Sequence, residues 1–420
     1  MKITGIIAEY NPFHNGHEYQ FRQIRKNSPD TYLIIVMSGN HVQRGEPSVY
    51  DKYTRTKAAL LAGADLVLEL PAAFAVSSAE DFAAAGVALL DQLGCVDELC
   101  FGSECGSIEP LTGIAALLAQ EPEAYQLSLR EGLKQGLTFP QARNQAIKSS
   151  NPQSEEQAAS PDMERDTVLQ SPNNILGIEY LKALIRRNSS IKPVTLARKG
   201  QGYHDQDLQH GFASASGIRS DLMNGAGPHL SEAAVNQVPA FAVPLYEAAV
   251  PIFPDDYSIL LNYTLLRLVQ EQQQLKDFAD VSPELEARIR NCLPDFTSFT
   301  GRIGQLKTRQ YTYTRISRSL LHILLGIKTS DIAAYRRLDY TPYARILGFR
   351  KASAPLLSHL KANTGIPLIT KIADAGRQLP AAAAEMLSQD LHCAHIYQMV
   401  QQQKSGVIPR NEFTQSVIII

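Results

Sequence analysis

The four residues His14-Asn15-Gly16-His17 bring together the side chains of this sequence that are best suited to chemistry. When a nucleotidyl group is transferred from ATP, negative charge builds on the α-phosphate as pyrophosphate leaves, and two imidazoles can donate hydrogen bonds to that charge. The glycine lets phosphates approach the backbone. The pattern predicts a nucleotide-binding site with His14 and His17 as catalytic residues. The alternative is a pair of surface histidines near a tight turn.

The position of this motif in the chain favours the nucleotide site. It directly follows a strand predicted at Ile3–Ala8 and begins a helix predicted at His17–Lys26. Ligands of α/β sheets bind at the carboxyl ends of the strands. The first turn of the helix adds free N–H groups and a favourable dipole for phosphate oxygens.

A second candidate segment is Ser214-Ala215-Ser216-Gly217-Ile218-Arg219, at the start of another predicted helix. Hydroxyls and an arginine suit phosphate oxygens, which a guanidinium binds bidentately. We therefore expect Ser216 and Arg219 to contact phosphate. The alternative is an ordinary serine N-cap followed by a solvated arginine.

A third group of polar residues follows the second predicted strand, at the sheet edge where His14 is expected. It comprises Ser38-Gly39-Asn40 and Gln43-Arg44-Gly45-Glu46-Pro47, and it suits a substrate loop as well as a plain connection. Arg55 and Lys57 follow on a predicted helix, and the sequence leaves open whether they face the site or solvent.

The net charge of −2 does not by itself indicate a nucleic-acid partner, but residues 301–351 hold eleven Lys or Arg against two acidic residues. Cations bind phosphates, and aromatic rings stack on unpaired bases. The stretch therefore predicts RNA binding, with Lys307, Arg309, Arg315 and Arg318 as contacts and with Tyr311, Tyr313, Tyr335, Tyr340 and Tyr343 interleaved. The alternative is a helical region with a basic solvated face and buried tyrosines.

The elements that must position these residues alternate between strands and helices in the first half of the chain. Continuous apolar runs such as Tyr32–Met37 are typical of strands buried on both faces. The alternation predicts an α/β fold: an N-terminal, Rossmann-like parallel-sheet nucleotidyltransferase domain (residues 1–225) followed by a mainly α-helical domain (255–420), with a linker at 226–254. Residues 149–171 are polar and predict a flexible loop or insertion within the first domain.

The composition argues against several classes of protein. No apolar run reaches the length of a membrane span, and the first residues lack the pattern of a signal peptide, so we expect a cytoplasmic protein without membrane association. The odd number of cysteines, five, argues against a disulfide framework, and the lack of a CxxC pair argues against a zinc site. We expect no dedicated metal site, and Mg²⁺ only as the usual companion of ATP phosphates.

The residues of these motifs resemble those of the tRNA(Met) cytidine acetate ligase family. The resemblance is carried by GIIAEYNPFHNGHEYQ, MSGNHVQRGEPSVYDKYTRTKAAL and ADLVLELP near the N-terminus. It continues in FGSE at 101–104, SPNNILGIEYLKAL at 171–184, GYHD at 202–205 and KTRQYTYTRISRSLLHILLG at 307–326.

The resemblance implies a two-step reaction. ATP and acetate would form acetyl-adenylate, and the acetyl group would pass to the wobble cytidine of elongator tRNA(Met), giving N(4)-acetylcytidine. It also implies an ATP site made of Ile7, Ala8, Glu9, Tyr10, Asn11, Pro12, Phe13, His14, Asn15, Gly16, His17, Glu18, Tyr19, Gln20, Gly102, Asn173, Arg198 and Lys199. Asn174 competes with Asn173 for its place in that set.

Three other functions are compatible with parts of this pattern. A small-molecule adenylyltransferase with an appended RNA-binding domain would leave the basic segment without a role in the chemistry. A non-catalytic RNA-binding protein would not need His14 and His17. A relative of class I aminoacyl-tRNA synthetases would be expected to carry a KMSKS-like segment, which this sequence lacks.

Overall fold

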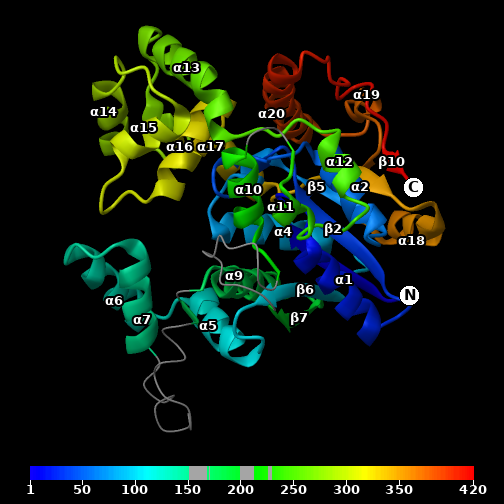
Figure 1. Cartoon of the computed structure of the whole chain (residues 1–420). Helices are drawn as coiled ribbons and strands as arrows, with labels where there is room; N and C mark the ends of the chain where they lie inside the picture. Colours follow the sequence, from blue (N-terminus) through cyan, green and yellow to red (C-terminus); the bar gives the residue numbers. More distant parts are fainter. Residues whose placement is uncertain (151–167, 170, 199–211, 226–228) are drawn as a thin grey trace. The chain divides into compact units, whose positions relative to one another are not determined.

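The computed structural model describes residues 1–150, 168–169, 171–198, 212–225 and 229–420 (Figure 1). The chain forms two compact units, one of Met1–Asp97 with Lys199–Ile420 and one of Glu98–Arg198. Most of the predicted insertion at 149–171 lies outside the described residues, as do Lys199 and the GYHD motif.

The first unit begins with alternating strands and helices. They are β1 (Ile3–Ala8), α1 (Asn15–Asn27), β2 (Tyr32–Ser38), β3 (His41–Val42), β4 (Glu46–Pro47), α2 (Lys52–Leu61), β5 (Leu66–Leu70), α3 (Ala72–Ala75) and α4 (Ala79–Gln92). Strands β1, β2 and β5 lie side by side and parallel, with Ile3 opposite Tyr32 and Ile34 opposite Leu66. Strand β2 is buried along nearly its whole length, as its uninterrupted apolar sequence predicts. The parallel α/β architecture predicted from the sequence is confirmed.

In its described residues, the second unit contains a pair of parallel strands and four named helices. Its elements are β6 (Glu98–Ser103), α5 (Glu109–Gln120), α6 (Glu123–Lys134), α7 (Phe139–Ser149), α9 (Pro172–Arg187) and β7 (Lys192–Ala197). Strand β6 pairs with β7 from Glu98 opposite Lys192 to Ser103 opposite Ala197. Helices α5, α6 and α7 are not predicted from the sequence.

The remainder of the first unit is mostly helical. It comprises α10 (Ala215–Asn224), α11 (Glu232–Val235), α12 (Val243–Glu247), η2 (Pro254–Tyr257), α13 (Ser258–Gln270), η3 (Leu275–Asp277), α14 (Pro283–Asn291), α15 (Phe299–Leu306), α16 (Tyr313–Leu325), α17 (Thr329–Arg337), β8 (Ala344–Phe349), η4 (Lys351–Ser353), α18 (Ala354–Asn363), β9 (Leu368–Ile369), α19 (Ile372–Ala375), α20 (Ala381–Ser405) and β10 (Ile418–Ile419). Helix α16 begins at a Thr312 cap and ends at Gly326 in the left-handed conformation. Helices α13 and α15 each pack on α16 (Figure 1).

The segment at 255–420, for which the sequence predicts a mainly α-helical domain, also contributes strands to the N-terminal sheet. Strand β8 lies antiparallel to β5, with Leu66 opposite Phe349, and β9 and β10 each pair with β8. The C-terminal segment therefore completes the N-terminal sheet, and boundaries at residues 225 and 255 do not coincide with the compact units. The run Ala344–Phe349 has the length of a strand, but only pairing with a strand far away in the sequence identifies it as one.

Buried ion pairs link the C-terminal segment to the N-terminal sheet. The Lys52 ammonium contacts both Glu69 on β5 and Glu412 of the C-terminal tail, at 2.8 and 3.1 Å. Arg345 on β8 pairs with the same two carboxylates. Two cations and two carboxylates thus neutralise one another where water is excluded, as buried charges require.

No helix within the described ranges is long and apolar enough to cross a membrane.

Candidate active site

The turn between β1 and α1 arranges the two histidines as a stacked pair. His14 caps α1, and its Nδ1 accepts the Gly16 N–H at 3.0 Å. His17, one turn later, uses its own Nδ1 to accept the His14 N–H at 3.2 Å. The ring centroids lie 3.8 Å apart, with 30° between the ring planes. The pair therefore belongs to a capped helix start.

These two hydrogen bonds determine which nitrogen of each ring carries a proton. An Nδ1 that accepts a backbone N–H is unprotonated, so the neutral ring carries its proton on Nε2. Both rings then present an Nε2–H donor, and the rings lie against each other. Two adjacent donors at a helix N-terminus suit the oxygens of one phosphate.

Gly16 makes room for this arrangement. A Cβ at this position would lie 2.8 Å from Cε1 of His14. Any other residue would push the His14 ring out of the stack. The structure thus supplies a reason for this glycine, additional to the close approach of phosphate that the sequence suggested.

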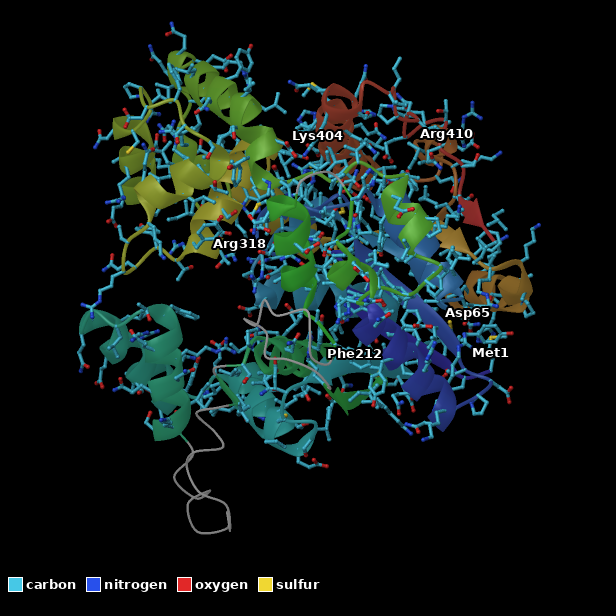
Figure 2. The ribbon with its side chains drawn as sticks, in the orientation of Figure 1. Met1, Asp65, Phe212, Arg318, Lys404 and Arg410 are labelled. Atoms are coloured by element: carbon cyan, nitrogen blue, oxygen red, sulfur yellow. The ribbon has the colours of Figure 1, made fainter. Side chains whose placement is uncertain are left out.

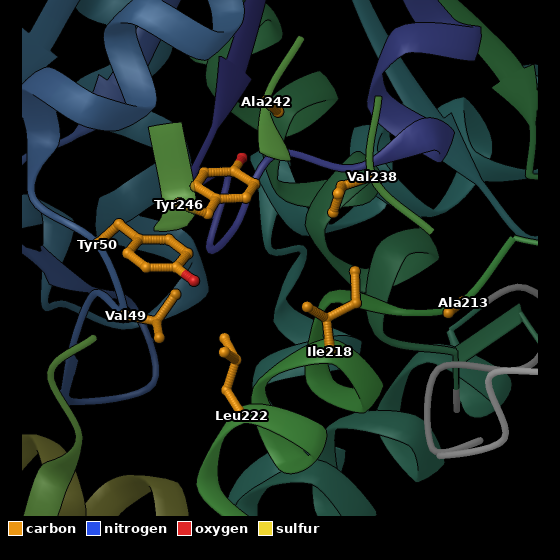
Figure 3. Close-up of a cluster of buried hydrophobic side chains, with 8 residues drawn as sticks. All are labelled: Val49, Tyr50, Ala213, Ile218, Leu222, Val238, Ala242 and Tyr246. Carbon is orange, nitrogen blue, oxygen red and sulfur yellow. The ribbon is translucent and has the colours of Figure 1, made fainter. Parts of the chain in front are cut away.

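The described part of the predicted linker, residues 229–254, packs against the turn that contains His14. Asn15 donates its backbone N–H to Gln237 O at 3.0 Å and its Nδ2 to Asn236 O at 2.9 Å. Tyr246 donates its hydroxyl to Phe13 O at 2.8 Å and stacks on Tyr50 with centroids 4.5 Å apart. Figure 3 shows the buried cluster to which these tyrosines belong, formed by Val49, Tyr50, Ala213, Ile218, Leu222, Val238, Ala242 and Tyr246.

Helix α10 brings the predicted phosphate residues to the same turn. Arg219 donates Nη1 to Asn11 O at 2.7 Å and Nη2 to the Ser216 hydroxyl at 3.2 Å. Ser214 caps the helix through the Gly217 N–H, so the alternative of a serine N-cap is correct for that residue. Arg219 and Ser216 lie beside the loop that leads into His14, where a phosphate contact would require them.

The polar loop after β2 lies at the same sheet edge as the turn after β1, as predicted. One buried residue, Arg55, joins the two. Its guanidinium donates to the carbonyl oxygens of Glu9, Ser38, Gly39 and Tyr50. Burial lowers the pKa of Arg55 from its ordinary value, and nearby acidic groups oppose this shift by raising the pKa. Lys57 is exposed, so of the two residues left open by the sequence only Arg55 faces this region.

Sequence reasoning did not find the role of Arg55. The signal available was a basic residue in the first turns of a helix that follows a polar loop. That signal does not separate a solvated arginine from one that binds carbonyl groups of distant loops.

In the second unit, three predicted ATP contacts come together around the end of β6. The Arg198 side chain runs past Gly102, where a Cβ would lie 3.3 Å from its Cγ. Arg198 donates Nη1 to Asn173 Oδ1 at 2.9 Å, and Asn173 donates Nδ2 to Glu104 at 2.6 Å. Gly102, Asn173 and Arg198 thus form one connected group.

The neighbouring Asn174 has a structural role. It is buried, and its Oδ1 accepts the backbone N–H groups of Glu104 and Cys105 at 2.9 and 3.2 Å. Asn173 is more exposed and is linked to Arg198. Of the two alternatives left by the sequence, Asn173 is therefore better placed to meet a ligand.

The other members of the predicted ATP stretch divide into core and surface residues. Ile7, Tyr10 and Phe13 are buried; Tyr10 lies edge-on to the rings of Phe13 and His17, at 4.9 and 4.7 Å. Glu18 pairs with Arg22 on the surface of α1. Tyr19 packs its ring on Phe212, which is labelled in Figure 2, at 5.6 Å.

The basic stretch is less uniform than its sequence suggests. Lys307 and Arg309 are exposed, and Arg315 lies over the Tyr311 ring at 4.9 Å. Arg318, on α16 (Figure 2), pairs with Asp280 at 2.8 Å, and its side chain is only 13% exposed. Arg318 is therefore poorly placed for the predicted RNA contact, because its charge is already neutralised inside the fold.

Several other residues of this stretch also serve the fold. Arg302 donates to the carbonyl oxygens of Cys292 and Asp295, and Arg336 pairs with Asp81. Tyr311, Tyr335 and Tyr343 are buried, as the alternative interpretation expected, whereas Tyr313 is 37% exposed.

Among the described residues, no group of three or more His, Cys, Asp or Glu side chains could hold a metal ion. All five cysteines carry free thiols.

Comparison with known proteins gives a consistent result over the whole chain. A family model described as HIGH Nucleotidyl Transferase matches residues 1–409. A tRNA(Met) cytidine acetate ligase of Acetivibrio thermocellus is 37% identical over 425 residues, covering 100% of both chains. One of Clostridium kluyveri is 40% identical over 404 residues, covering 95% of each chain.

Two solved structures share the fold. The apo crystal structure of Thermotoga maritima TmcAL aligns with a TM-score of 0.90 and 30% identity over 100% of both chains. The crystal structure of the same protein bound with alpha-thio ATP aligns with a TM-score of 0.89 and 29% identity, over 100% of this chain and 99% of the other.

Proposed function

Since the chain belongs to the tRNA(Met) cytidine acetate ligase family of HIGH nucleotidyl transferases, we propose that it is an ATP-dependent ligase that joins acetate to a cytidine of tRNA(Met). The target is the wobble cytidine of the elongator tRNA, and the product is N(4)-acetylcytidine. We place the activity in the cytoplasm, where tRNA is modified.

The stacked pair of His14 and His17 is the observation that carries this proposal. Their Nδ1 atoms accept backbone N–H groups, which places the proton of each neutral ring on Nε2. In the first step an oxygen of acetate attacks the α-phosphorus of ATP, and the bond to pyrophosphate breaks. The two Nε2–H groups donate to the α-phosphate oxygens, where charge accumulates.

The second step consumes the mixed anhydride. The exocyclic amine of cytosine attacks the acetyl carbonyl, and AMP leaves. This amine is a weak nucleophile, so the enzyme must hold it close to the anhydride and exclude water, which would hydrolyse the intermediate. The target base must also leave its stack to reach the site.

We assign ATP binding to residues Ile7 to Gln20, supported by the histidine pair and by Arg219 and Ser216 beside Asn11. Gly102, Asn173 and Arg198 contribute further ATP contacts, supported by their connection to one another. Lys199 belongs to this set by resemblance alone. Mg²⁺ enters with the ATP phosphates, and we assign it no protein ligand.

For the tRNA we assign backbone contacts to Lys307, Arg309 and Arg315. The exposure of the first two and the position of Arg315 over Tyr311 support this assignment. Arg318 is left out because of its ion pair with Asp280.

The proposal is tested by incubating the protein with ATP, labelled acetate and bulk tRNA. We expect label in elongator tRNA(Met), recovered as N(4)-acetylcytidine after nuclease digestion. Acetate-dependent release of pyrophosphate without label in tRNA would instead favour a small-molecule adenylyltransferase with an appended RNA-binding domain.

A further inference from the structure

Glu9 is a carboxylate held rigidly at the carboxyl end of β1, in the same compact unit as His14 and His17. Its Oε1 accepts the Gln43 N–H at 2.7 Å, and its backbone carbonyl accepts Nη1 of Arg55 at 2.6 Å. Within the described part of the chain, Oε2 accepts no hydrogen bond. One oxygen is thus anchored by the loop after β2, and the other remains available to a ligand.

The charges around Glu9 suit a group that exchanges protons. Burial raises the pKa of this carboxyl above its ordinary value, although the Gln43 hydrogen bond and the charges of Arg219, Arg44 and Arg55 oppose the rise. A carboxylate of raised pKa is a better base than a solvated one.

Two neighbouring carboxylates at this end of the sheet are already occupied. Asp51 caps α2, where its oxygens accept from the backbone of Tyr53 and Thr54 and from the Thr54 hydroxyl. Glu69 is neutralised by Lys52 and Arg345. Among the residues that the structure describes, Glu9 differs from both because it has no ion pair and keeps an oxygen without a donor.

We propose that Glu9 is the general base of the acetyl-transfer step. This inference rests on the function proposed above. As the exocyclic nitrogen of cytosine forms its bond to the acetyl carbon, Oε2 of Glu9 takes one of the two amine protons. The carbonyl then re-forms, the bond to the AMP oxygen breaks with its electron pair, and AMP leaves. The product keeps one N–H, and Glu9 returns its proton to solvent.

A general base of the second step takes up no proton in the first step. Formation of acetyl-adenylate from acetate and ATP transfers no proton, because acetate is already ionised. This difference separates a base from a residue that binds ATP, since loss of an ATP contact would slow both steps.

The test compares the two steps in the Glu9→Gln variant. The glutamine keeps an oxygen for the Gln43 N–H, so the loop stays anchored while the base is lost. The first step is followed by acetate-dependent exchange of labelled pyrophosphate into ATP. The second is followed in a single turnover, by mixing enzyme carrying labelled acetyl-adenylate with tRNA(Met). Asp30→Asn, an exposed carboxylate before β2, is the control.

We expect acetyl transfer by Glu9→Gln to fall by roughly 10²–10⁴-fold, and exchange to fall far less, since Glu9 also lies in the proposed ATP-binding stretch. The unmodified protein should lose transfer rate as the pH falls through the pKa of Glu9, and the variant should lack this dependence. Transfer at the unmodified rate would overturn the inference, and so would a parallel loss of exchange and transfer. If the unmodified protein shows no acetate-dependent exchange, the proposed function itself fails.

Discussion

Gly45 and Arg318 pack backbone against backbone. A Cβ on Gly45 would lie 2.3 Å from the amide nitrogen of Arg318, and the Ser317 hydroxyl donates to Gly45 O at 2.8 Å. Gly45 also has a φ of +81°, which glycine adopts readily and other residues do not. The loop after β2 is thereby attached to α16, which begins beside the proposed tRNA contacts.

Gly45→Ala should separate this loop from α16. We expect the free energy of unfolding to fall by about 1–3 kcal/mol, from the left-handed backbone and the steric clash together. The measurement is urea unfolding. Gly304→Ala is the matched control, because nothing lies within 4 Å of its position on α15. Equal stability of the two variants would show that the close approach at Gly45 is unimportant.

His17→Ala should slow the first step. The substitution removes one Nε2–H donor to the α-phosphate, and loss of one such donor costs roughly 10²–10³-fold in rate. Acetate-dependent pyrophosphate exchange measures this directly. His359→Ala, on α18, should leave exchange unchanged. A His17→Ala variant with full exchange activity would contradict the assignment of this residue.

Arg55→Lys should be strongly destabilising despite the conserved charge. Lysine carries a single nitrogen and cannot reach the four carbonyl oxygens that the guanidinium holds. Each buried carbonyl left without a donor costs about 1–3 kcal/mol. We expect a lower midpoint of thermal unfolding and slower exchange. A variant that retained both would mean that Arg55 does not position the loops.

Glu412→Ala should lower the free energy of unfolding, because it disrupts the buried network of ion pairs. Removing this carboxylate leaves Lys52 and Arg345 with Glu69 alone, and breaking a buried ion pair costs about 3–5 kcal/mol. Glu271→Ala, which breaks the exposed pair with Arg267, should cost about 0–1 kcal/mol. Denaturant unfolding of both variants at neutral pH tests the difference. Similar losses in both would contradict the prediction.

The same carboxylate should make stability depend on pH. Burial alone would raise the pKa of Glu412, but Lys52 and Arg345 lower it from 4.5 to about 2. The contribution of Glu412 to stability is therefore complete above its ordinary pKa and is lost as the pH falls through about 2. Unfolding free energies measured across this acidic range should decline less steeply in Glu412→Gln than in the unmodified protein.

The exposed cations of the basic stretch should control tRNA affinity. Charge reversal of Lys307 or Arg309 should weaken tRNA binding at moderate salt. In a plot of the logarithm of affinity against the logarithm of salt concentration, the slope should become less steep by about the amount expected for one lost phosphate contact. Lys57→Glu, an exposed cation on α2, is the control. Arg318→Glu should instead reduce stability, because it opposes Asp280. Unchanged affinity in the Lys307 and Arg309 variants would contradict the assignment of tRNA contacts to this stretch.

The sequence by itself determined the features that depend on local pattern. The strand at Ile3–Ala8, the helix that His14 caps and the buried strand β2 all follow from periodicity and from residues adjacent in the chain. The proposed nucleotide site could be located in the sequence because its two histidines are three residues apart at a strand–helix junction. The family was identifiable from contiguous motifs for the same reason.

Only the tertiary structure decided which charged residues are available for chemistry. Arg309 and Arg318 look alike in the sequence, but one is exposed and the other is paired with Asp280. Arg55 and Glu412 acquire their roles from groups far away in the chain, as does the strand that pairs with β5. Such roles depend on partners brought together by folding, and the residues next to them in the sequence do not reveal those partners.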